Sequence, residues 1–395
     1  MSWVRLGVPS HRAPMISNQL FGRMPGKRMR DVRACLQAYS LALELFDKYV
    51  TLPSAPNVHY GTSTLYTGLM QLSMSGGYAE STMDDLALRY GLDSPCGGAF
   101  LYRLKKLDRA DWDSRLREVN DAVLSIASRL GLLDRPVVCA IDYTKVPYYG
   151  EFNRYVTRSK HERGTNHFYE YATISVVQDG VRLCVYSRPV TLLDVKVDVV
   201  RELVEEAERR GVKVKLVLLD RAFFTVECID LLKGLGLKFV MPCVCNERVQ
   251  REVDTFGREG RLPFAIRDSH QVEEASFTMV VCWSEKKGKL IPFATNVEAR
   301  NAMSLVAEIP KEYRRRWGIE TSFRKVKEVY GMTLSPSPAI RLAYFMVAMV
   351  LYNLWQAVNM ALAAGSERRR RRTDGYRVTM PFMVTVLCAH LNGRL

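Results

Sequence analysis

Two apolar runs that each end in an aspartate constrain the fold most strongly. Residues 135–142 read Arg-Pro-Val-Val-Cys-Ala-Ile-Asp, and residues 213–220 read Lys-Val-Lys-Leu-Val-Leu-Leu-Asp. Short runs rich in valine, isoleucine and leucine are typical of strands that are buried on both faces. The two runs therefore predict a sheet covered by helices, with Asp142 and Asp220 closing two of its strands.

The residues between and after these runs predict the rest of a mixed sheet. Asp179-Gly180 is a hairpin signal, and Gly211 is a helix stop signal. The further predicted elements, in chain order, are a strand at 167–177, a strand at 181–190, a helix at 197–210, a helix at 225–235 and a strand at 238–243. This order predicts an α/β fold in which helices flank a mixed sheet.

The positions of the two aspartates predict a ligand site. In sheets of this kind, ligands bind beyond the carboxyl ends of parallel strands. If the two strands are parallel neighbours, the side chains of Asp142 and Asp220 lie close together. Two carboxylates at such a short distance require a cation between them. An aspartate that closes a strand is often only a turn residue, so this pair alone leaves both interpretations open.

A third acidic residue lies in a helical pattern near residue 320. Tyr313, Arg316, Glu320 and Lys327 are spaced by three, four and seven, which places them within an arc of roughly 60° on one helix. An apolar stripe lies beside this arc, formed by Ile319, Phe323, Val326 and Tyr330. Glu320 is thus predicted at the edge of buried surface, with cations that can hold phosphates. The alternative is a solvated basic helix with ordinary ion pairs.

These residues resemble those of the DDE transposases of prokaryotic insertion sequences, in the cut-and-paste group. That group is marked by the motif Y-x-x-R-x-x-x-E-x-x-x-x-x-x-K, which residues 313–327 match without a gap or substitution. The segments Ile141–Thr144 and Leu219–Phe224 resemble the segments that carry the family's first and second acids. The resemblance covers residues from about 137 to 356, and it implies an RNase H-like catalytic fold.

The resemblance also implies the chemistry of the site. Asp142, Asp220 and Glu320 are expected to be catalytic and to bind two Mg²⁺ ions, or Mn²⁺, about 4 Å apart. Water would nick the end of the element, and the freed 3′ hydroxyl would then attack a second phosphodiester. The resemblance assigns Tyr313, Arg316 and Lys327 to the DNA backbone. We add Arg221 and Arg324 as DNA-binding residues, because each lies next to, or one helical turn from, an expected metal ligand.

The hundred positions between Asp220 and Glu320 predict an insertion. Strand-like runs at 275–283 and 290–295 indicate that it is β-rich. Trp283 could stack on a base there, but a tryptophan on a half-buried strand is more often a core residue, so we do not assign it to the site. The expected division is an N-terminal helical DNA-binding domain at 1–130, the first part of the catalytic core at 131–243, the insertion at 244–308, the glutamate helix and the helix after it at 309–365, and a basic tail at 366–395.

The distribution of charge favours a nucleic-acid partner. The net charge is +15, and residues 1–40 contribute +6 while residues 366–395 contribute +5. Basic termini of this kind suit binding to phosphates, although the run Arg368–Arg372 could equally be a disordered solubilising segment. Helices predicted at 81–90 and 99–107, the second one basic, permit a helix-turn-helix that reads terminal repeats. The same pattern is common in helical bundles that bind no DNA.

The sequence favours neither a structural zinc site nor a membrane span. The nine cysteines lack the paired spacing of a structural zinc site, and free thiols are typical of a reducing cytoplasm. Residues 342–364 are uncharged and precede five arginines, as in a membrane span. Asn353, Gln356 and Asn359 lie on one face of that segment, however, which favours a core helix packed on the sheet. We expect no membrane association and a cytoplasmic, nucleoid-associated protein.

The expected function is that of an insertion-sequence transposase that binds terminal inverted repeats and catalyses strand cleavage and strand transfer. Its partners would be double-stranded DNA, as transposon ends and as target, and a second copy of the chain, because two ends must be cut together. One alternative is an RNase H-like nuclease or resolvase, which gives no reason for the motif at residues 313–327. The other is a catalytically inactive DNA-binding derivative, which the intact acidic triad disfavours.

Overall fold

The structure, a computed structural model, describes residues 26–53, 58–256, 260–267, 274–299, 301–364 and 378–391. Most of the two basic tails, including Arg368–Arg372, lies outside these residues. Contacts divide the chain into two compact units, which we describe separately. Unit 1 comprises Met1–Leu132 and Ser322–Leu395, and unit 2 comprises Leu133–Thr321.

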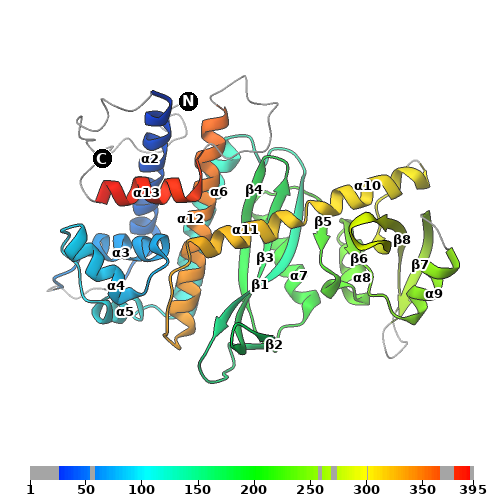
Figure 1. The fold of residues 1–395 in the computed structure, drawn as a ribbon, viewed down its shortest axis with the longest axis horizontal. Helices are drawn as coiled ribbons and strands as arrows, with labels where there is room; N and C mark the ends of the chain where they lie inside the picture. The colour runs from blue at the N-terminus through cyan, green and yellow to red at the C-terminus, as the bar shows by residue number, and fades with distance from the viewer. Residues whose placement is uncertain are drawn as a thin grey trace. The chain divides into compact units, whose positions relative to one another are not determined.

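Unit 2 is built on one nine-stranded sheet (Figure 1). Its strands are β1 (Val137–Tyr148), β2 (Thr157–Glu162), β3 (Thr165–Gln178), β4 (Val181–Val190), β5 (Val214–Leu219), β6 (Lys238–Pro242), β7 (Gly260–Arg267), β8 (Glu274–Ser284) and β9 (Lys289–Thr295). The order across the sheet is β2-β3-β1-β5-β6-β9-β8-β7, and β4 also pairs with β3. The predicted strands of the core and of the insertion are confirmed, whereas β2 and β7 were not predicted.

The sheet is mixed, as the order of elements predicted. β1 pairs in parallel with β5, and β5 with β6. β3 pairs antiparallel with both β1 and β4, and the hairpin between β3 and β4 turns at Gly180, whose φ of 77° favours glycine. Four consecutive residues of β5 are buried, because helices cover the sheet on both sides.

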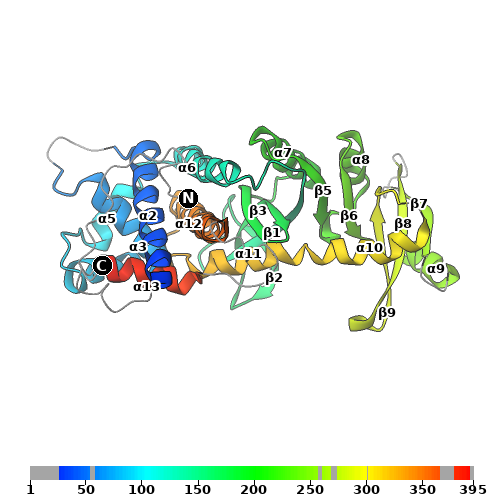
Figure 2. The ribbon, with the colours of Figure 1, turned by 90° about the horizontal axis from the view of Figure 1, so that it is seen from above.

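The helices of unit 2 lie on opposite faces of the sheet (Figure 2). They are α7 (Lys196–Arg209), α8 (Val226–Gly234), α9 (Glu247–Phe256), α10 (Ala302–Arg314) and the start of α11 (Trp317–Glu328), with 3-10 turns at Arg221–Phe223 and Glu285–Lys287. α7 contacts β3 and β4, and α8 contacts β6 and β8, on one face. α10 contacts β6, β7 and β8 on the other face.

Unit 1 is helical in its described residues. Its helices are α2 (Gly26–Tyr49), α3 (Thr62–Ser75), α4 (Ala79–Asp84) continued by a π-helix (Asp85–Arg89), α5 (Gly97–Leu104), α6 (Arg109–Arg129), α12 (Pro338–Ala364), α13 (Met380–Leu391) and the later part of α11. Residues 322–364, which we expected to join the catalytic core, therefore cluster with the N-terminal helices. The functional division at residues 130, 243, 308 and 365 remains a prediction.

α12 is the central helix of unit 1. It is long and apolar enough to span a membrane, but 94 % of its apolar window is buried in the folded chain. Its contacts within unit 1 are with α6, α2 and α3. Its polar side chains are satisfied inside the core, since Asn353 donates to Asn120 Oδ1 at 2.7 Å and Gln356 donates to the Tyr352 hydroxyl at 2.9 Å. The helix therefore has the features of a core helix, as its polar face predicted.

α4 and α5 approach each other very closely at Gly97. A Cβ atom on Gly97 would lie 2.5 Å from the backbone of Glu80, so only glycine permits this contact. The first of these helices starts two residues earlier than the predicted residue 81. α4 begins at Ala79, before Ser81, and the Ser81 hydroxyl donates to the carbonyl of Tyr78 instead of accepting from the first turn. The close packing of Gly97 on Glu80 thus sets the distance between α4 and α5.

Candidate active site

Asp142 and Asp220 lie side by side on adjacent parallel strands. The ladder between β1 and β5 ends with Ile141 opposite Leu219, so the two aspartates are the next residues on each side. Neighbouring strands are about 4.8 Å apart, so the two side chains lie close together at the carboxyl ends of the parallel pairing between β1 and β5. The predicted convergence of these strands is confirmed.

Asp142 does not end its strand, and that part of the prediction is wrong. β1 continues for six residues to Tyr148, because β3 keeps pairing with it after β5 has stopped. Asp142 lies where the parallel ladder ends while the antiparallel ladder goes on. Its Oδ1 accepts a hydrogen bond from the backbone N–H of Tyr143 at 2.8 Å. The carboxylate therefore lies on an ordered strand, at the point where the pairing with β5 ends, and not on a turn.

The motif residues do not share one helix, contrary to the prediction. α10 ends at Arg314 and α11 begins at Trp317, so Tyr313 and Glu320 lie on different helices and Arg316 lies in the turn between them. The backbone N–H of Arg316 bonds to the carbonyl of Tyr313 at 3.0 Å, a three-residue step that tightens the chain. This turn directs the Arg316 side chain toward the sheet.

Arg316 joins two of the three predicted acids. Its Nη1 donates to Oδ2 of Asp142 at 2.9 Å, and its Nη2 donates to Oε1 of Glu320 at 2.5 Å. The side chains of Arg316 and Asp142 are only 9 % and 16 % exposed, whereas that of Glu320 is 41 % exposed. A largely buried guanidinium therefore compensates a largely buried carboxylate.

The charges of Asp220 and Glu320 both act on Asp142. Burial raises the pKa of Asp142 to about 6, against the opposing effects of Arg316 and of the Tyr143 N–H, and the charges of Asp220 and Glu320 raise it further. The pKa of Arg316 is raised as well. Burial opposes that rise, and it is outweighed by Tyr313 and the three carboxylates. The site concentrates negative charge that calls for cations.

Tyr313 forms an aromatic wall of this site. Its ring centroid is 5.1 Å from that of Phe293 on β9, and the Arg316 guanidinium lies 5.5 Å above the Tyr313 ring. Burial raises the pKa of Tyr313 to about 12, so its hydroxyl is neutral at pH 7. Phe293 was not predicted as part of the site, because only the antiparallel pairing of β9 with β6 brings it there.

The other predicted DNA-binding residues are exposed. Arg221 follows Asp220 as the first residue of a 3-10 turn, and Arg324 and Lys327 lie on the exposed side of α11. Among the described residues, Arg221 and Arg324 form no ion pair. Their assignment to DNA remains a prediction.

Gly318 is a further site residue that the sequence reasoning missed. A Cβ atom there would lie 3.1 Å from Cβ and Cγ1 of Val177 on β3. Glycine thus allows the start of α11 to approach β3, and this approach sets the depth of Arg316 and Glu320. The glycine between Arg316 and Glu320 in the motif is the sequence signal that could have predicted this close approach.

The donor set fits a hard divalent cation, although no group of three or more His, Cys, Asp and Glu side chains among the described residues is arranged to hold one. Carboxylate oxygens are the ligands that Mg²⁺ prefers. The Asp220 carboxylate has no hydrogen bond or ion pair among the described residues and is half-buried. The Arg316 guanidinium supplies the positive charge between Asp142 and Glu320.

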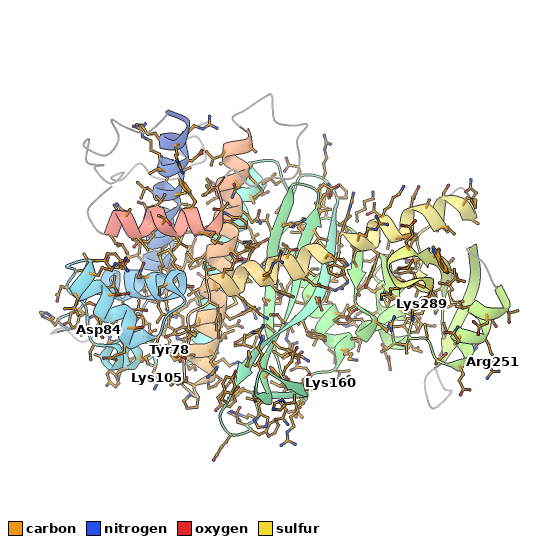
Figure 3. All side chains as sticks on the ribbon, viewed as in Figure 1. Tyr78, Asp84, Lys105, Lys160, Arg251 and Lys289 are labelled. Carbon is orange, nitrogen blue, oxygen red and sulfur yellow. The ribbon has the colours of Figure 1, made fainter. Side chains whose placement is uncertain are left out.

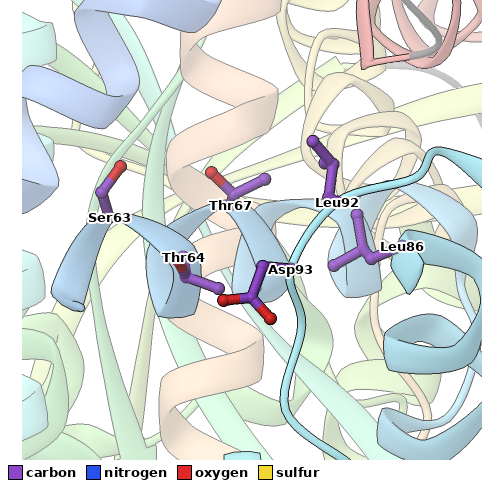
Figure 4. Close-up of a pocket in the computed structure, with 6 residues that line it drawn as sticks. All are labelled: Ser63, Thr64, Thr67, Leu86, Leu92 and Asp93. Carbon is purple, nitrogen blue, oxygen red and sulfur yellow. The ribbon is translucent and has the colours of Figure 1, made fainter. Parts of the chain in front are cut away.

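A pocket of about 220 Å³ lies elsewhere, in unit 1 (Figure 4). It is lined by Ser63, Thr64, Thr67, Leu86, Leu92 and Asp93. None of these residues was predicted as a site residue, and Asp93 is the one ionisable residue among the six.

Comparisons with known proteins identify the family of this chain and a structure with a similar fold. Residues 135–354, more than half of the 395 residues, match the family described as Transposase DDE domain. A cryo-electron microscopy structure of a piggyBac transposase synaptic complex with hairpin DNA has the same mixed α/β fold, with a TM-score of 0.55 and 14 % identity over 91 % of this chain and 80 % of that chain. None of the curated proteins matches this chain. The chain therefore belongs to the transposase DDE domain family, and it is a DNA transposase.

Proposed function

We propose that this chain is a cut-and-paste transposase of an insertion sequence, which cleaves and joins DNA at Asp142, Asp220 and Glu320. One observation carries the proposal. Arg316 contacts Asp142 and Glu320 directly, and Asp220 is the residue beside Asp142 on the next parallel strand. Three acids that are far apart in the chain thus lie near the point where the parallel pairing of β1 and β5 ends. This arrangement supports an RNase H-like catalytic core.

The three carboxylates would hold two Mg²⁺ or Mn²⁺ ions. When bound, these ions would supply Lewis-acid stabilisation to the attacking and leaving oxygens of the phosphodiester. Asp142 is held in place by the N–H of Tyr143, which orients it without neutralising it. Arg316 donates to two of the acids, and its guanidinium would bind a phosphate that enters the site.

The surrounding residues would position the DNA. The hydroxyl of Tyr313 is neutral and lies beside Arg316, and it would donate a hydrogen bond to a phosphate oxygen. Lys327, Arg324 and Arg221 are exposed cations on α11 and on the 3-10 turn after Asp220. The DNA would carry terminal inverted repeats, and two copies of the chain would pair two ends.

A cleavage assay with matched variants tests this function. Purified protein with Mg²⁺ is incubated with duplex DNA carrying the inverted repeats that flank its coding region. We expect nicking at the repeat ends, and we expect Asp220→Asn to abolish it while DNA binding persists. Asp230→Asn, which removes an exposed carboxylate on α8, serves as the control and should leave cleavage intact. Cleavage by Asp220→Asn at the wild-type rate would refute the assignment.

Metal binding provides a second readout that does not depend on turnover. Ligands that bind only the folded state stabilise it, by about 2.7 kcal/mol at a hundredfold excess over Kd. We expect Mg²⁺ to raise the Tm of the wild type and of Asp230→Asn, and to leave the Tm of Asp220→Asn nearly unchanged. An equal rise in all three proteins would place the bound metal elsewhere.

A further inference from the structure

A basic surface lies beyond Asp142, outside the motif at residues 313–327. We call residues 149–167 the basic β-arm. It consists of the loop after β1, the strand β2 and the first residues of β3. Four exposed cations lie on it, Arg154, Arg158, Lys160 and Arg163, against two exposed acids, Glu151 and Glu162. None of the four cations pairs with a carboxylate among the described residues, so their charge is available to a partner (Figure 3 labels Lys160).

Aromatic rings are interleaved with these cations. The Arg158 guanidinium lies 4.3 Å from the ring centroid of Phe152, and that ring is 5.5 Å from His167. Phe152 is 38 % exposed and Tyr149 is 68 % exposed. Unpaired cations bind phosphates, and exposed rings offer flat surfaces to bases, so the combination fits a nucleic acid better than an acidic protein surface.

The basic β-arm is held in one conformation by hydrogen bonds. The Tyr149 hydroxyl donates to the carbonyl of Arg163 at 2.9 Å, and the Thr165 hydroxyl donates to the carbonyl of Tyr148 at 2.7 Å. Lys145 on β1 donates to the Ser159 hydroxyl on β2 at 2.7 Å. Because the strands are already ordered, little conformational entropy would be lost when this surface binds.

The register of the strands connects the arm to Asp142. Tyr148 lies opposite His167, which in turn lies opposite Arg158, so the three side chains share one face of the sheet. Side chains alternate along a strand, so Asp142 and Tyr148, six residues apart on β1, are on that same face. At about 3.4 Å per residue along the strand, Tyr148 is about 20 Å from the aspartate, and Arg158, two strands across at about 4.8 Å each, is about 23 Å from it. One turn of B-DNA spans about 34 Å, so a single duplex can reach both.

We propose that the basic β-arm binds the phosphate backbone of the DNA duplex, within one helical turn of the phosphate that is cut at Asp142. The position of the cut rests on the proposed function, whereas the binding of DNA by the arm does not require catalysis. The arm thus adds affinity without sequence preference, and it orients the duplex along β1.

The salt dependence of DNA binding tests the arm directly. Binding of a 40-base-pair duplex of random sequence is measured by fluorescence anisotropy between about 50 and 200 mM salt, a range over which phosphate contacts dominate the affinity. Each phosphate contact contributes about 0.9 to the slope of log K against log salt. We expect Arg158→Ala/Lys160→Ala to reduce the magnitude of this slope by about 2 and to weaken binding about tenfold or more at the lower salt concentration.

A matched variant controls for net charge. Lys213→Ala/Lys215→Ala also removes two exposed cations that pair with no carboxylate in the part of the chain that the structure describes. These two lysines lie at the opposite end of the sheet, at the start of β5. The slope of this control variant should equal that of the wild type. Equal slopes for both double variants would overturn the proposal. Unchanged thermal unfolding of the arm variant, whose two side chains are exposed, shows that any loss of binding is not a loss of folding.

The location of the contact is tested separately from catalysis. The measurements are made in the Asp220→Asn background, where a loss of binding cannot reflect a loss of cleavage. Phosphate ethylation interference on a duplex that carries the repeat end should show arm-dependent positions within about ten base pairs of the end. Positions only farther away would refute the placement. If Asp220→Asn still cleaves but the slopes differ as expected, the arm stands and the proposed catalytic site falls.

Discussion

Arg316 donates a hydrogen bond of 2.9 Å to Asp142, although 174 positions separate the two residues in the chain. The same guanidinium also reaches Glu320. The contact joins the turn between α10 and α11 to the strand β1, which lies between β3 and β5 in the sheet. It holds a buried aspartate and a buried arginine together in the candidate active site, and each would be costly to leave alone.

Removal of one partner of this pair is expected to destabilise unit 2. Arg316→Ala leaves Asp142 buried without its cation, and breaking a buried ion pair in this way costs about 3 kcal/mol. Asp142→Asn relieves part of that cost, because an amide need not be paired with a charge. The double variant should therefore lose less stability than the sum of the two single variants. Urea unfolding of the four proteins measures the coupling, and additive losses would show that the pair does not interact.

Gly318→Ala is expected to impair cleavage more than folding. The new methyl group would lie 3.1 Å from Val177 and push the start of α11 away from β3, at a cost of about 1 kcal/mol. The shift would carry Arg316 and Glu320 with it and lower the cleavage rate several-fold. Val177→Ala in the same chain removes Cγ1, one of the two Val177 atoms that the new methyl group would meet at 3.1 Å. It should restore part of the rate, and a double variant as slow as Gly318→Ala would contradict this steric cause.

Gly97→Ala and Gly98→Ala are adjacent substitutions that should have opposite effects. A Cβ atom on Gly97 would lie 2.5 Å from the Glu80 backbone, so this variant should lose about 1–3 kcal/mol through overpacking of α4 and α5. A Cβ atom on Gly98 meets no atom within 4 Å, and alanine favours a helix by up to about 1 kcal/mol over glycine. Thermal unfolding distinguishes the two, and equal Tm values would contradict the close packing.

Glu206 is expected to stabilise the protein only above acidic pH. Burial alone would raise its pKa, but hydrogen bonds and charges from Arg209 and Arg210 lower it from 4.5 to about 2. A depressed carboxyl pKa contributes stability that is complete above the unfolded value of 4.5 and is lost as the pH falls toward 2. Glu206→Gln should thus be less stable than the wild type at pH 7, and this difference should vanish near pH 2.

The neighbouring Glu205 provides the control for this pH dependence. Its side chain is exposed and forms no ion pair among the described residues. Glu205→Gln should therefore follow the wild type in denaturant unfolding from pH 7 down to pH 3. A difference between Glu206→Gln and the wild type that is independent of pH would mean that the glutamate acts through packing rather than through its charge.

The sequence alone determined the strands that carry Asp142 and Asp220 and the hairpin between β3 and β4. Apolar runs, an Asp-Gly turn and stop signals at glycine are local properties, and each favours one backbone conformation whatever surrounds it. The spacing from Tyr313 to Lys327 likewise marked the site residues. The catalytic and DNA-binding roles of those residues remain predictions from that pattern.

Tertiary structure alone decided how these residues meet. The helix predicted through Arg316 is broken there, because the side chain turns inward to a buried carboxylate whose desolvation must be compensated. β1 runs past Asp142 because β3 continues to supply its hydrogen bonds. Contacts between residues far apart in the chain decided both features, across 174 positions for Arg316 and Asp142 and across about 20 to 30 for β1 and β3. No local pattern contains such contacts.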